Sequence, residues 1–473
     1  MEREKLNTHQ KALRVNLDPR WYGTFAEIGA GQEVVRWFFR VGAAAGTISK
    51  SISAYDMTVS DAIYGECERY VSRPRLESML EYEHRLNLER LSESRGDDTA
   101  FFAFADTVSA LNYQGTNECH GWMGVRYQAR PRDEDSQIIM HVRMLDRENA
   151  LQQEALGIVG VNLLYGAFYL HQDPEALLES LLDGLTTARV EIDMIEFSGI
   201  EFRNVDNRLM SLKLVQLGLS EAAMFAADGE VLQPSEVLYK RPVLVERGSF
   251  RPVCFVNIDM LEAASEKFAQ EPDVQGKQII RLMELTMHKL TTDSDGDVDP
   301  RDFLARADVL AASGMTVLIS EYFEYEGLVN YLSRCTKERI AITMGAGSLM
   351  EILDTKYYTN LEGGILESFG RLFKTDVKLY IYPLRDPQTQ EMVMVDNLPV
   401  AQELRHLYQH LVDNNYLVQL DNYNEQYLHI FSRDILKKIK NQDPTWEEMV
   451  PPEVAKVIKQ RGFFGYKRNV MRV

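Results

Sequence analysis

The sequence predicts an α/β protein with a mostly parallel, layered α/β C-terminal half and an α+β N-terminal part made of helices and a small sheet. Two observations lead to this prediction. From residue 189 onward, short apolar runs alternate with amphipathic helical segments, which is typical of parallel sheets covered by helices. Before residue 189, a long helical segment precedes three runs of alternating apolar and polar residues, which favour adjacent half-buried strands.

Composition places the chain among ordinary globular proteins and excludes some partners. Its 473 residues suggest about three folding units. Lys plus Arg number 52 and Asp plus Glu number 71, so the formal net charge is 52 minus 71, or −19. Such a charge repels DNA and RNA, and we expect no DNA partner. The four cysteines lie far apart without a CxxC pair, a usage that indicates reduced thiols in the cytoplasm.

No segment of the sequence predicts a membrane span. The N-terminus, MEREKLNTHQK, is charged and lacks the apolar run of a secretory signal. The longest uncharged stretch, residues 155–170, is shorter than the roughly 20 residues that cross a bilayer. We therefore interpret this stretch as a buried helix and expect a cytoplasmic protein.

The N-terminal part divides into two predicted regions. Residues 1–97 are expected to be mainly helical, because leucines recur near helical spacing between charged residues over 73–93. Residues 98–188 are expected to form a small sheet plus helices. Its strands are predicted at 101–111, 120–130 and 137–145, and its helices at 149–170 and 174–187, the latter opened by Asp173-Pro174.

The C-terminal part also divides into two predicted regions. Residues 189–396 are expected to form the layered α/β domain, with a helix over 275–290 and strands at 189–197, 222–226, 241–245, 253–258, 315–319, 340–344 and 377–382. Residues 397–473 are expected to be a helical C-terminal region that ends in a basic aromatic tail.

The first candidate ligand site follows a short apolar strand near the N-terminus. Glu27, Gly29 and Gly31 in the stretch EIGAG precede a helix, as in nucleotide and S-adenosylmethionine sites, where glycines let the ligand approach the helix N-terminus. Val34 occupies the third glycine position, however, and Glu33 would repel a pyrophosphate. The alternative is that these glycines only permit close packing.

The second candidate ligand site is the junction between a strand and a helix at residues 340–352. Gly345, Gly347 and Ser348 would offer backbone amides and a hydroxyl at the carboxyl edge of a parallel sheet, where open α/β folds bind ligands. Arg371 and Lys374 could face the same crevice and neutralise a phosphate. Alternatively, Ser348 is only a helix cap.

An acidic stretch, TTDSDGDVDPRD, resembles a calcium-binding loop in its spacing. The carboxylates that could hold a weakly bound divalent cation are Asp293, Asp295, Asp297, Asp299 and Asp302. Thr291 stands where an EF-hand has its first Asp, which argues against tight binding. The alternative is a solvated acidic turn in which Asp302 caps the next helix.

Two further groups of polar residues have weaker functional interpretations. Cys119 and His120 could act as nucleophile and base, but neighbours in a strand point to opposite faces, so a structural histidine is favoured. Glu191 and Asp193 share a face of a predicted strand, either as an acid/base pair or as a solvent-facing polar stripe.

The C-terminal tail differs in charge from the rest of the chain. Residues 455–473 carry six Lys and Arg residues and three aromatic residues without any acid. Because the rest of the chain is acidic, we expect the tail to lie on its own body or on a neighbouring subunit rather than on nucleic acid. A homo-oligomer is the expected assembly.

Several stretches are similar to a known family. YGTFAEIGAGQE, SAYDM and SDAIYG near the N-terminus, together with residues 357–383, resemble a family of uncharacterised bacterial proteins of about this length, and the resemblance covers nearly the whole chain. Members carry the names nicotinate-nucleotide adenylyltransferase and TonB-dependent receptor. The sequence fits neither name, because it lacks an HxGH motif and the pattern of an exported barrel protein. The resemblance implies no catalytic residues.

Two functional hypotheses follow. The first is binding of a nucleotide or other phosphorylated metabolite at the edge of the α/β sheet. The second is a noncatalytic, self-assembling homo-oligomer or filament protein whose tail docks on a neighbour. The α/β edge favours the first hypothesis.

Overall fold

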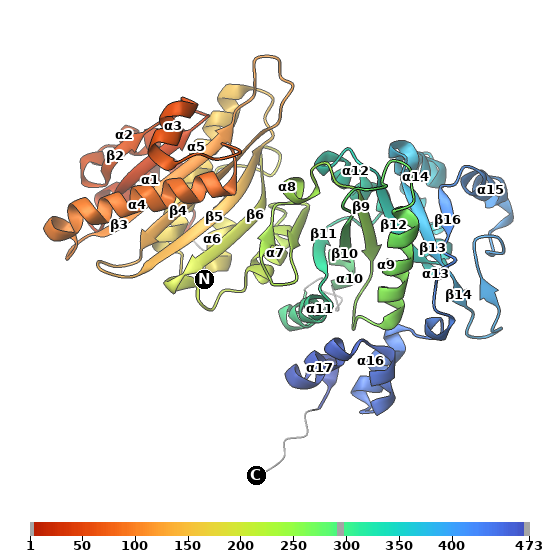
Figure 1. The fold of residues 1–473 in the computed structure, drawn as a ribbon. Helices are drawn as coiled ribbons and strands as arrows, with labels where there is room; N and C mark the ends of the chain where they lie inside the picture. Colours follow the sequence, from red (N-terminus) through yellow and green to blue (C-terminus); the bar gives the residue numbers. More distant parts are fainter. Residues whose placement is uncertain (1–3, 291–297, 468–473) are drawn as a thin grey trace, which may run out of the picture. The chain divides into compact units, whose positions relative to one another are not determined.

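The computed structural model describes residues 4–290 and 298–467. The chain divides into two compact units, residues 1–223 and residues 224–473, which are described separately (Figure 1). Both units combine helices with sheets, so the predicted α/β class is confirmed. Among the described helices, none combines the length and the apolarity that a membrane crossing requires.

The first unit is built on a mixed sheet. Within the described residues its order is β2-β1-β3-β4-β5-β6, in which β1 runs parallel to β2 and β3 and the remaining neighbours are antiparallel. The strands are β1 (Trp21–Ile28), β2 (Ile48–Ile52), β3 (Ala100–Ser109), β4 (Cys119–Gln128), β5 (Asp135–Met144) and β6 (Val190–Gly199).

Helices cover both faces of this sheet. The long helix α4 contacts β1, β3 and β4 on one face, and α5 contacts β4 and β5 on the other (Figure 1). Successive residues of a strand point to opposite faces, which lets one strand serve both helices. The helices are α1 (Thr8–Leu17), α2 (Glu33–Val41), α3 (Met57–Tyr64), α4 (Arg73–Arg95), α5 (Asn149–Tyr169), α6 (Pro174–Ser180) and α7 (Asn207–Gln216).

Helix α5 is the centre of the first core, as expected for the uncharged stretch over residues 155–170. The ring of Phe168 in α5 stacks on the ring of Trp21 in β1, with ring centroids 4.1 Å apart. A Cβ atom on Gly160 would lie 2.3 Å from the Val34 side chain of α2, so glycine is needed for the two helices to approach. The predicted buried helix is therefore confirmed.

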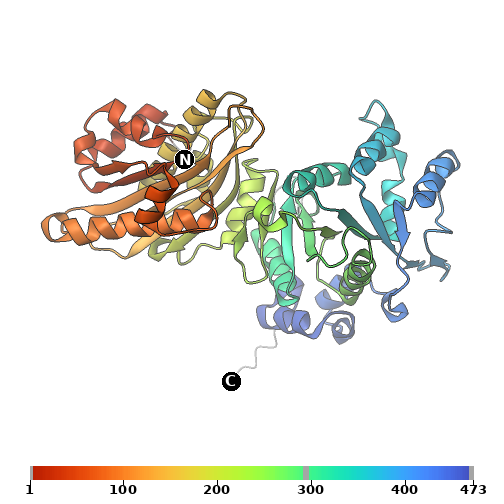
Figure 2. The ribbon, with the colours of Figure 1, turned by 45° about the horizontal axis from the view of Figure 1, so that its top comes forward.

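The second unit is built on a mainly parallel sheet. Among the described residues its order is β16-β13-β12-β9-β10-β11-β7-β8. Figure 2 shows this unit, coloured green to blue, in a turned view. The strands are β7 (Ala222–Phe225), β8 (Val231–Leu232), β9 (Val243–Arg247), β10 (Ile280–Thr286), β11 (Thr316–Ser320), β12 (Ile340–Gly345), β13 (Lys378–Tyr382) and β16 (Leu417–Gln419). A separate hairpin joins β14 (Leu384–Arg385) to β15 (Met392–Val393).

The helices of the second unit follow its strands in the chain. Helix α9 lies across β9 and β12, and α11 contacts both β11 and α17 (Figure 1). The helices are α8 (Pro234–Leu238), α9 (Phe255–Phe268), α10 (Met287–Leu290), α11 (Pro300–Ala312), α12 (Tyr325–Cys335), α13 (Ala346–Ile352), α14 (Gly364–Leu372), α15 (Arg405–Asp413), α16 (Ser432–Lys440) and α17 (Pro452–Arg461).

The strand order of the second sheet reverses next to β9. From β11 to β16 the parallel strands occur in the order β11-β10-β9-β12-β13-β16, which in chain order is 3-2-1-4-5-6. This is the order of doubly wound nucleotide-binding folds. Connections therefore leave β9 and β12 in opposite directions, and a crevice opens at their carboxyl ends.

The structure corrects the predicted organisation at several places. The only division within the described chain follows residue 223, not residues 97, 188 or 396. Strand β1 hydrogen-bonds to β3 and β6 hydrogen-bonds to β5, so boundaries at 98 and 189 would cut one sheet. The strand expected at 253–258 lies largely in α9, and the helix expected at 275–290 contains β10. In these segments tertiary packing overrides the local pattern.

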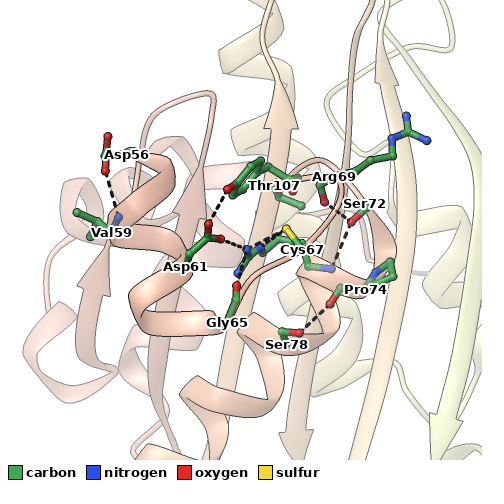
Figure 3. Close-up of polar contacts among 12 residues, drawn as sticks. Asp56, Val59, Asp61, Gly65, Cys67, Arg69, Ser72, Pro74, Ser78 and Thr107 are labelled. Carbon is green, nitrogen blue, oxygen red and sulfur yellow. Dashed lines mark hydrogen bonds and ion pairs between the residues drawn. The ribbon is translucent and has the colours of Figure 1, made fainter.

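A buried arginine organises the segment before α4. Arg75 is 1% exposed, and its guanidinium donates to Asp61, to the Gly65 carbonyl and to the Cys67 sulfur at 2.7, 2.8 and 2.9 Å. Figure 3 labels these three partners. Tyr70 donates to the same Asp61 carboxylate at 2.7 Å. The network therefore ties the chain between α3 and α4 to the helix that covers the sheet.

We expect Arg75→Met to destabilise the first unit by roughly 2 kcal/mol, because it leaves the Asp61 carboxylate and the Gly65 carbonyl without their charged donor. Urea unfolding followed by circular dichroism measures the change. The control is Arg85→Met on the same helix, whose pair with Glu89 is exposed and should contribute about 0.5 kcal/mol or less. Equal losses in the two variants would contradict the role of Arg75.

Candidate ligand-binding site

A cavity of about 250 Å³ opens at the carboxyl edge of the second sheet. Its wall comes from the last residue of β9, from the residues that follow β10, β11 and β12, and from α14 with the segment that precedes it. It therefore lies at the edge where the strand order reverses, which is the usual ligand crevice of open α/β folds. The lining residues are Arg247, His288, Lys289, Phe323, Glu324, Tyr325, Glu326, Ser348, Glu351, Ile352, Tyr357, Tyr358, Ser368, Phe369 and Leu372.

Aromatic rings form one side of the cavity. Phe323 meets His288 edge-on with centroids 5.1 Å apart, and its ring centroid lies 6.4 Å from that of Tyr357. Phe323 and Tyr357 are both exposed, although large aromatic side chains are usually buried. This side of the cavity therefore offers planar apolar surface to a ligand ring.

Arg247 forms the charged floor of the cavity. Its guanidinium binds both carboxylate oxygens of Glu284 on β10, at 2.7 and 2.8 Å, and donates to the Phe323 carbonyl at 2.6 Å. It also lies 4.3 Å from the centroid of the Tyr325 ring. Ser320 on β11 donates to Glu284 at 2.5 Å. The positive charge of Arg247 is therefore neutralised by Glu284 within the protein.

Lys289 supplies a cation to the cavity wall. No hydrogen bond or ion pair involves its amine in the part of the chain that the structure describes. The surrounding protein and the neighbouring Arg247 guanidinium lower the pKa of Lys289, whereas Glu284 and Glu351 partly offset this effect. Lys289 therefore sits in the cavity wall as the donor best placed to bind an added anion.

Glu246 is a second buried carboxyl group near the cavity. It precedes Arg247 on β9 and is completely buried, and Asn257 of α9 donates to one of its oxygens at 2.8 Å. Within the described residues, the other carboxyl oxygen has no hydrogen-bond partner. Burial raises the pKa of Glu246 to about 8. The folded protein therefore favours the protonated carboxyl group.

The structure places part of the second candidate site at this cavity. Ser348 of α13 lines it, whereas Gly345 and Gly347 lie beside it and are half-buried. No atom lies within 4 Å of the position where a Cβ of Gly345 would stand. A Cβ of Gly347 would lie 3.6 Å from the Leu384 side chain, so only Gly345 faces open space.

Arg371 and Lys374 lie outside the cavity lining. Arg371 pairs with Glu326 of α12 at 3.3 Å and also with Glu367 on its own helix. Lys374 is exposed in the short turn after α14. The structure therefore does not bring these two cations together with Ser348, and a phosphate contact by either one stays a prediction.

The first candidate motif lies in the other unit and has internal partners. Glu27 is completely buried, and its carboxylate accepts the backbone N–H groups of Val34 and Val35 at 3.2 and 2.8 Å. These amides belong to the N-terminal turn of α2, where a phosphate would bind. Gly29 has a φ of 105°, and a Cβ there would lie 1.8 Å from the Val108 carbonyl. Gly31 has a φ of 90°.

The acidic stretch is only partly described. Asp293, Asp295 and Asp297 lie outside the described residues. Asp299 caps α11 by accepting the Arg301 N–H at 2.9 Å, and Asp302 pairs with Arg251 at 2.7 Å and with Arg306 at 2.5 Å. No group of three metal-ligating side chains occurs among the residues with described positions. Divalent cation binding there stays a prediction.

The described part of the tail contacts its own unit. Helix α17 contacts α11, and Lys459 of α17 pairs with Glu447 at 2.8 Å. Tyr466 packs against Trp446 with ring centroids 6.1 Å apart, and Phe464 is buried. These contacts agree with one of the two expected positions of the tail. Homo-oligomer formation and docking of its last residues on a neighbour stay predictions.

Comparisons with known proteins give little further information. No protein-family model matches the chain, and no curated protein matches its sequence. A competence/damage inducible protein, CihA, from Agrobacterium tumefaciens is 16% identical, with 35% of this chain and 97% of that chain covered and a TM-score of 0.25. A CinA superfamily protein from Enterobacter cloacae is 14% identical, with 36% and 96% covered and a TM-score of 0.24. Likenesses this weak carry no functional argument.

Sequence patterns missed most of the cavity wall. Lys289 falls at the end of the segment that was expected to be one helix over 275–290, so the carboxyl end of β10 was not recognised. Phe323 and Tyr325 follow β11 and could have been found, because side chains just after a parallel strand face the ligand edge. Tyr357 lies in a short 3-10 helix, Thr355–Tyr358, that does not directly follow a strand.

We expect Glu246→Gln to stabilise the protein most at about pH 8. Between about pH 5 and pH 8 the native state keeps a proton on Glu246 that the unfolded chain has released, so the free energy of unfolding falls as pH rises. The amide of glutamine mimics the protonated carboxyl group at every pH. Melting temperatures of the variant and the unmodified protein should therefore diverge by on the order of a few degrees between these pH values.

The control for this experiment is Glu453→Gln on the exposed surface of α17. It removes the same charge from the chain without changing a buried group. A difference for Glu246→Gln that is constant across the pH range, or that matches the control, would contradict the buried protonated carboxyl group.

Proposed function

We propose that the cavity binds a small metabolite that combines an aromatic ring with an anionic group, and that a nucleotide is the class that fits it best. The observation behind this proposal is the coincidence of the cavity with the carboxyl edge of a 3-2-1-4-5-6 sheet. Without that coincidence, the aromatic and charged residues would be a surface cluster of no particular meaning.

The two sides of the cavity match the two ends of such a ligand. Phe323 and Tyr357 provide exposed faces on which a base can stack, and base–aromatic stacking contributes about 1–3 kcal/mol per base. Lys289 provides a point charge for a phosphate, whereas Arg247 is neutralised by Glu284. The Ser348 hydroxyl lies in the same wall.

Carboxylates on the rim limit which ligands fit. Glu324, Glu326 and Glu351 line the cavity, so the charge around Lys289 is balanced or negative. A ligand with many phosphates would be repelled, whereas hydroxyl groups of a ribose could donate to a carboxylate. We therefore favour a nucleoside monophosphate over a triphosphate.

The expected compartment for this activity is the cytoplasm, where nucleotides are abundant. All four cysteines, Cys67, Cys119, Cys254 and Cys335, are free thiols, which fits a reducing compartment. Location remains part of the proposal.

A thermal shift experiment with single compounds tests the proposal. We expect a nucleoside monophosphate to raise the melting temperature, because ligand at 100 times its dissociation constant stabilises the native state by about 2.7 kcal/mol. The panel contains adenosine, the nucleoside mono- and triphosphates, and inorganic phosphate. No shift with any compound would contradict nucleotide binding.

Two variants separate the ends of the site. Lys289→Met should abolish the higher affinity for the monophosphate than for the nucleoside. Phe323→Ala should weaken the binding of both compounds because it removes a stacking surface. The control is Lys267→Met, which removes a lysine of α9 that pairs with Asp421 at 2.7 Å and does not line the cavity. If Lys289→Met and Lys267→Met lower affinity equally, the phosphate is not bound in the cavity.

A further inference from the structure

A row of hydrogen-bonded titratable side chains crosses three strands of the first unit. His120 of β4, His141 of β5 and Asp193 of β6 are joined by two hydrogen bonds, of 3.0 Å between the histidines and 2.6 Å between His141 and the carboxylate. His141 and Asp193 are buried, at 2% and 4% exposed, whereas His120 is only half-buried. The row therefore leads from a buried carboxylate to an accessible imidazole.

The carboxylate fixes which ring nitrogens carry protons. A carboxylate at Asp193 can only accept, so Nδ1 of His141 donates to it, and with a single proton on its ring His141 keeps the lone pair on Nε2. Nε2 of His141 then accepts from Nδ1–H of His120. As a result, Nε2 of His120 carries the lone pair at the accessible end of the row. These tautomers are assigned from the hydrogen-bond network.

The surroundings keep this lone pair available at neutral pH. Burial and the adjacent His141 lower the pKa of His120 to about 4, although Asp193 and Glu118 act in the opposite direction. The nearby Arg143 is held by Glu191 at 2.5 Å and by Glu118 at 3.4 Å. Its charge is therefore balanced by carboxylates outside the row.

We propose that His120, His141 and Asp193 form a proton relay that makes Nε2 of His120 a general base for water or another hydroxyl compound that attacks an activated acyl ester. The attacking O–H gives its proton to Nε2, and its oxygen bonds to the acyl carbon as the ester C–O bond breaks. The Nδ1 proton of His120 passes to Nε2 of His141. His141 thus becomes the cation and lies beside the Asp193 carboxylate, and the alcoholate is released as the leaving group.

The relay differs from an ordinary buried polar network in the effect that His141 and Asp193 have on reactions at His120. In a purely structural network, Asp193 would satisfy His141 and have no effect on reactions at His120. In a relay, Asp193 and His141 are positioning residues whose removal changes the chemistry of His120 without touching the bound compound. The site lies in the first unit, so it is independent of the proposed nucleotide cavity.

The first test measures the tautomers in the unmodified protein. Long-range nitrogen–proton NMR correlations of ¹⁵N-histidine protein at about pH 7 should show His120 protonated on Nδ1 and unprotonated on Nε2. His120→Asn assigns the signal by its loss. A His120 that carries its proton on Nε2 would overturn the proposal, and this result does not depend on whether a variant folds.

The second test measures hydrolysis of p-nitrophenyl acetate by the full chain. We expect His120→Asn and Asp193→Asn each to reduce the rate by about tenfold or more, in line with typical contributions of general acid–base catalysis. The matched control is His171→Asn, which removes another histidine–carboxylate pair of the same unit, 3.6 Å from Glu201, and should keep the unmodified rate.

Labelling with diethyl pyrocarbonate separates reactivity from folding. Nε2 of His120 attacks one carbonyl of the reagent, the anhydride C–O bond breaks, and the departing ethyl carbonate takes up the proton released by the imidazole. Mass spectrometry should find His120 modified several-fold more slowly in Asp193→Asn than in the unmodified protein, with His171 as the internal reference. Equal modification rates, or equal ester hydrolysis by His120→Asn and the unmodified protein, would overturn the relay.

Discussion

The parallel pairing of β9 with both β10 and β12 is the constraint on which the second unit depends. Because the first parallel strand of this sheet is central, later strands add on either side of it, and their connections separate at the carboxyl edge. The last residue of β9 and the segments that follow β10, β11 and β12 then line one cavity. Position in the topology, rather than any single motif, therefore brings Arg247, Lys289, Phe323 and Ser348 together.

The first unit depends on a different constraint, the need to satisfy buried charge inside a mixed sheet. Glu27 and Asp106 lie side by side on β1 and β3, and burial raises the pKa of both groups. Glu27 is bonded to the first amides of α2, so a carboxyl group of the chain occupies the place that a ligand takes in phosphate-binding folds. A sequence motif can thus share the spacing of a ligand site while its donors are used internally.

The fold class and several elements could be predicted from the sequence because their patterns are local. Helix α5 followed from an uncharged stretch, and β3, β4 and β5 followed from alternation. The domain boundaries could not be predicted, since β1 and β3 are far apart in the chain but adjacent in the sheet. Strand β10 was hidden because Ile280–Thr286 lies in a run whose apolar spacing also suits a helix.

The candidate sites show the same limit. The junction at Gly345 and Ser348 was recognised because a strand, a turn and a helix are consecutive in the sequence. The row from His120 to Asp193 was not, because its middle member, His141, comes from a third strand and carries no pattern of its own. Side chains that meet only through cross-strand register cannot be paired by spacing along the chain.

Arg247 has a mechanical consequence for the cavity. It joins the end of β9 to Glu284 within β10 and donates to the carbonyl of Phe323, which follows β11. Three neighbouring segments are therefore held together by one guanidinium. The bottom of the cavity cannot deepen or tilt without breaking charged hydrogen bonds. Selectivity among ligands must then come from how well a ligand fills a cavity of fixed depth. Only the exposed aromatic side chains at its edge remain free to adjust.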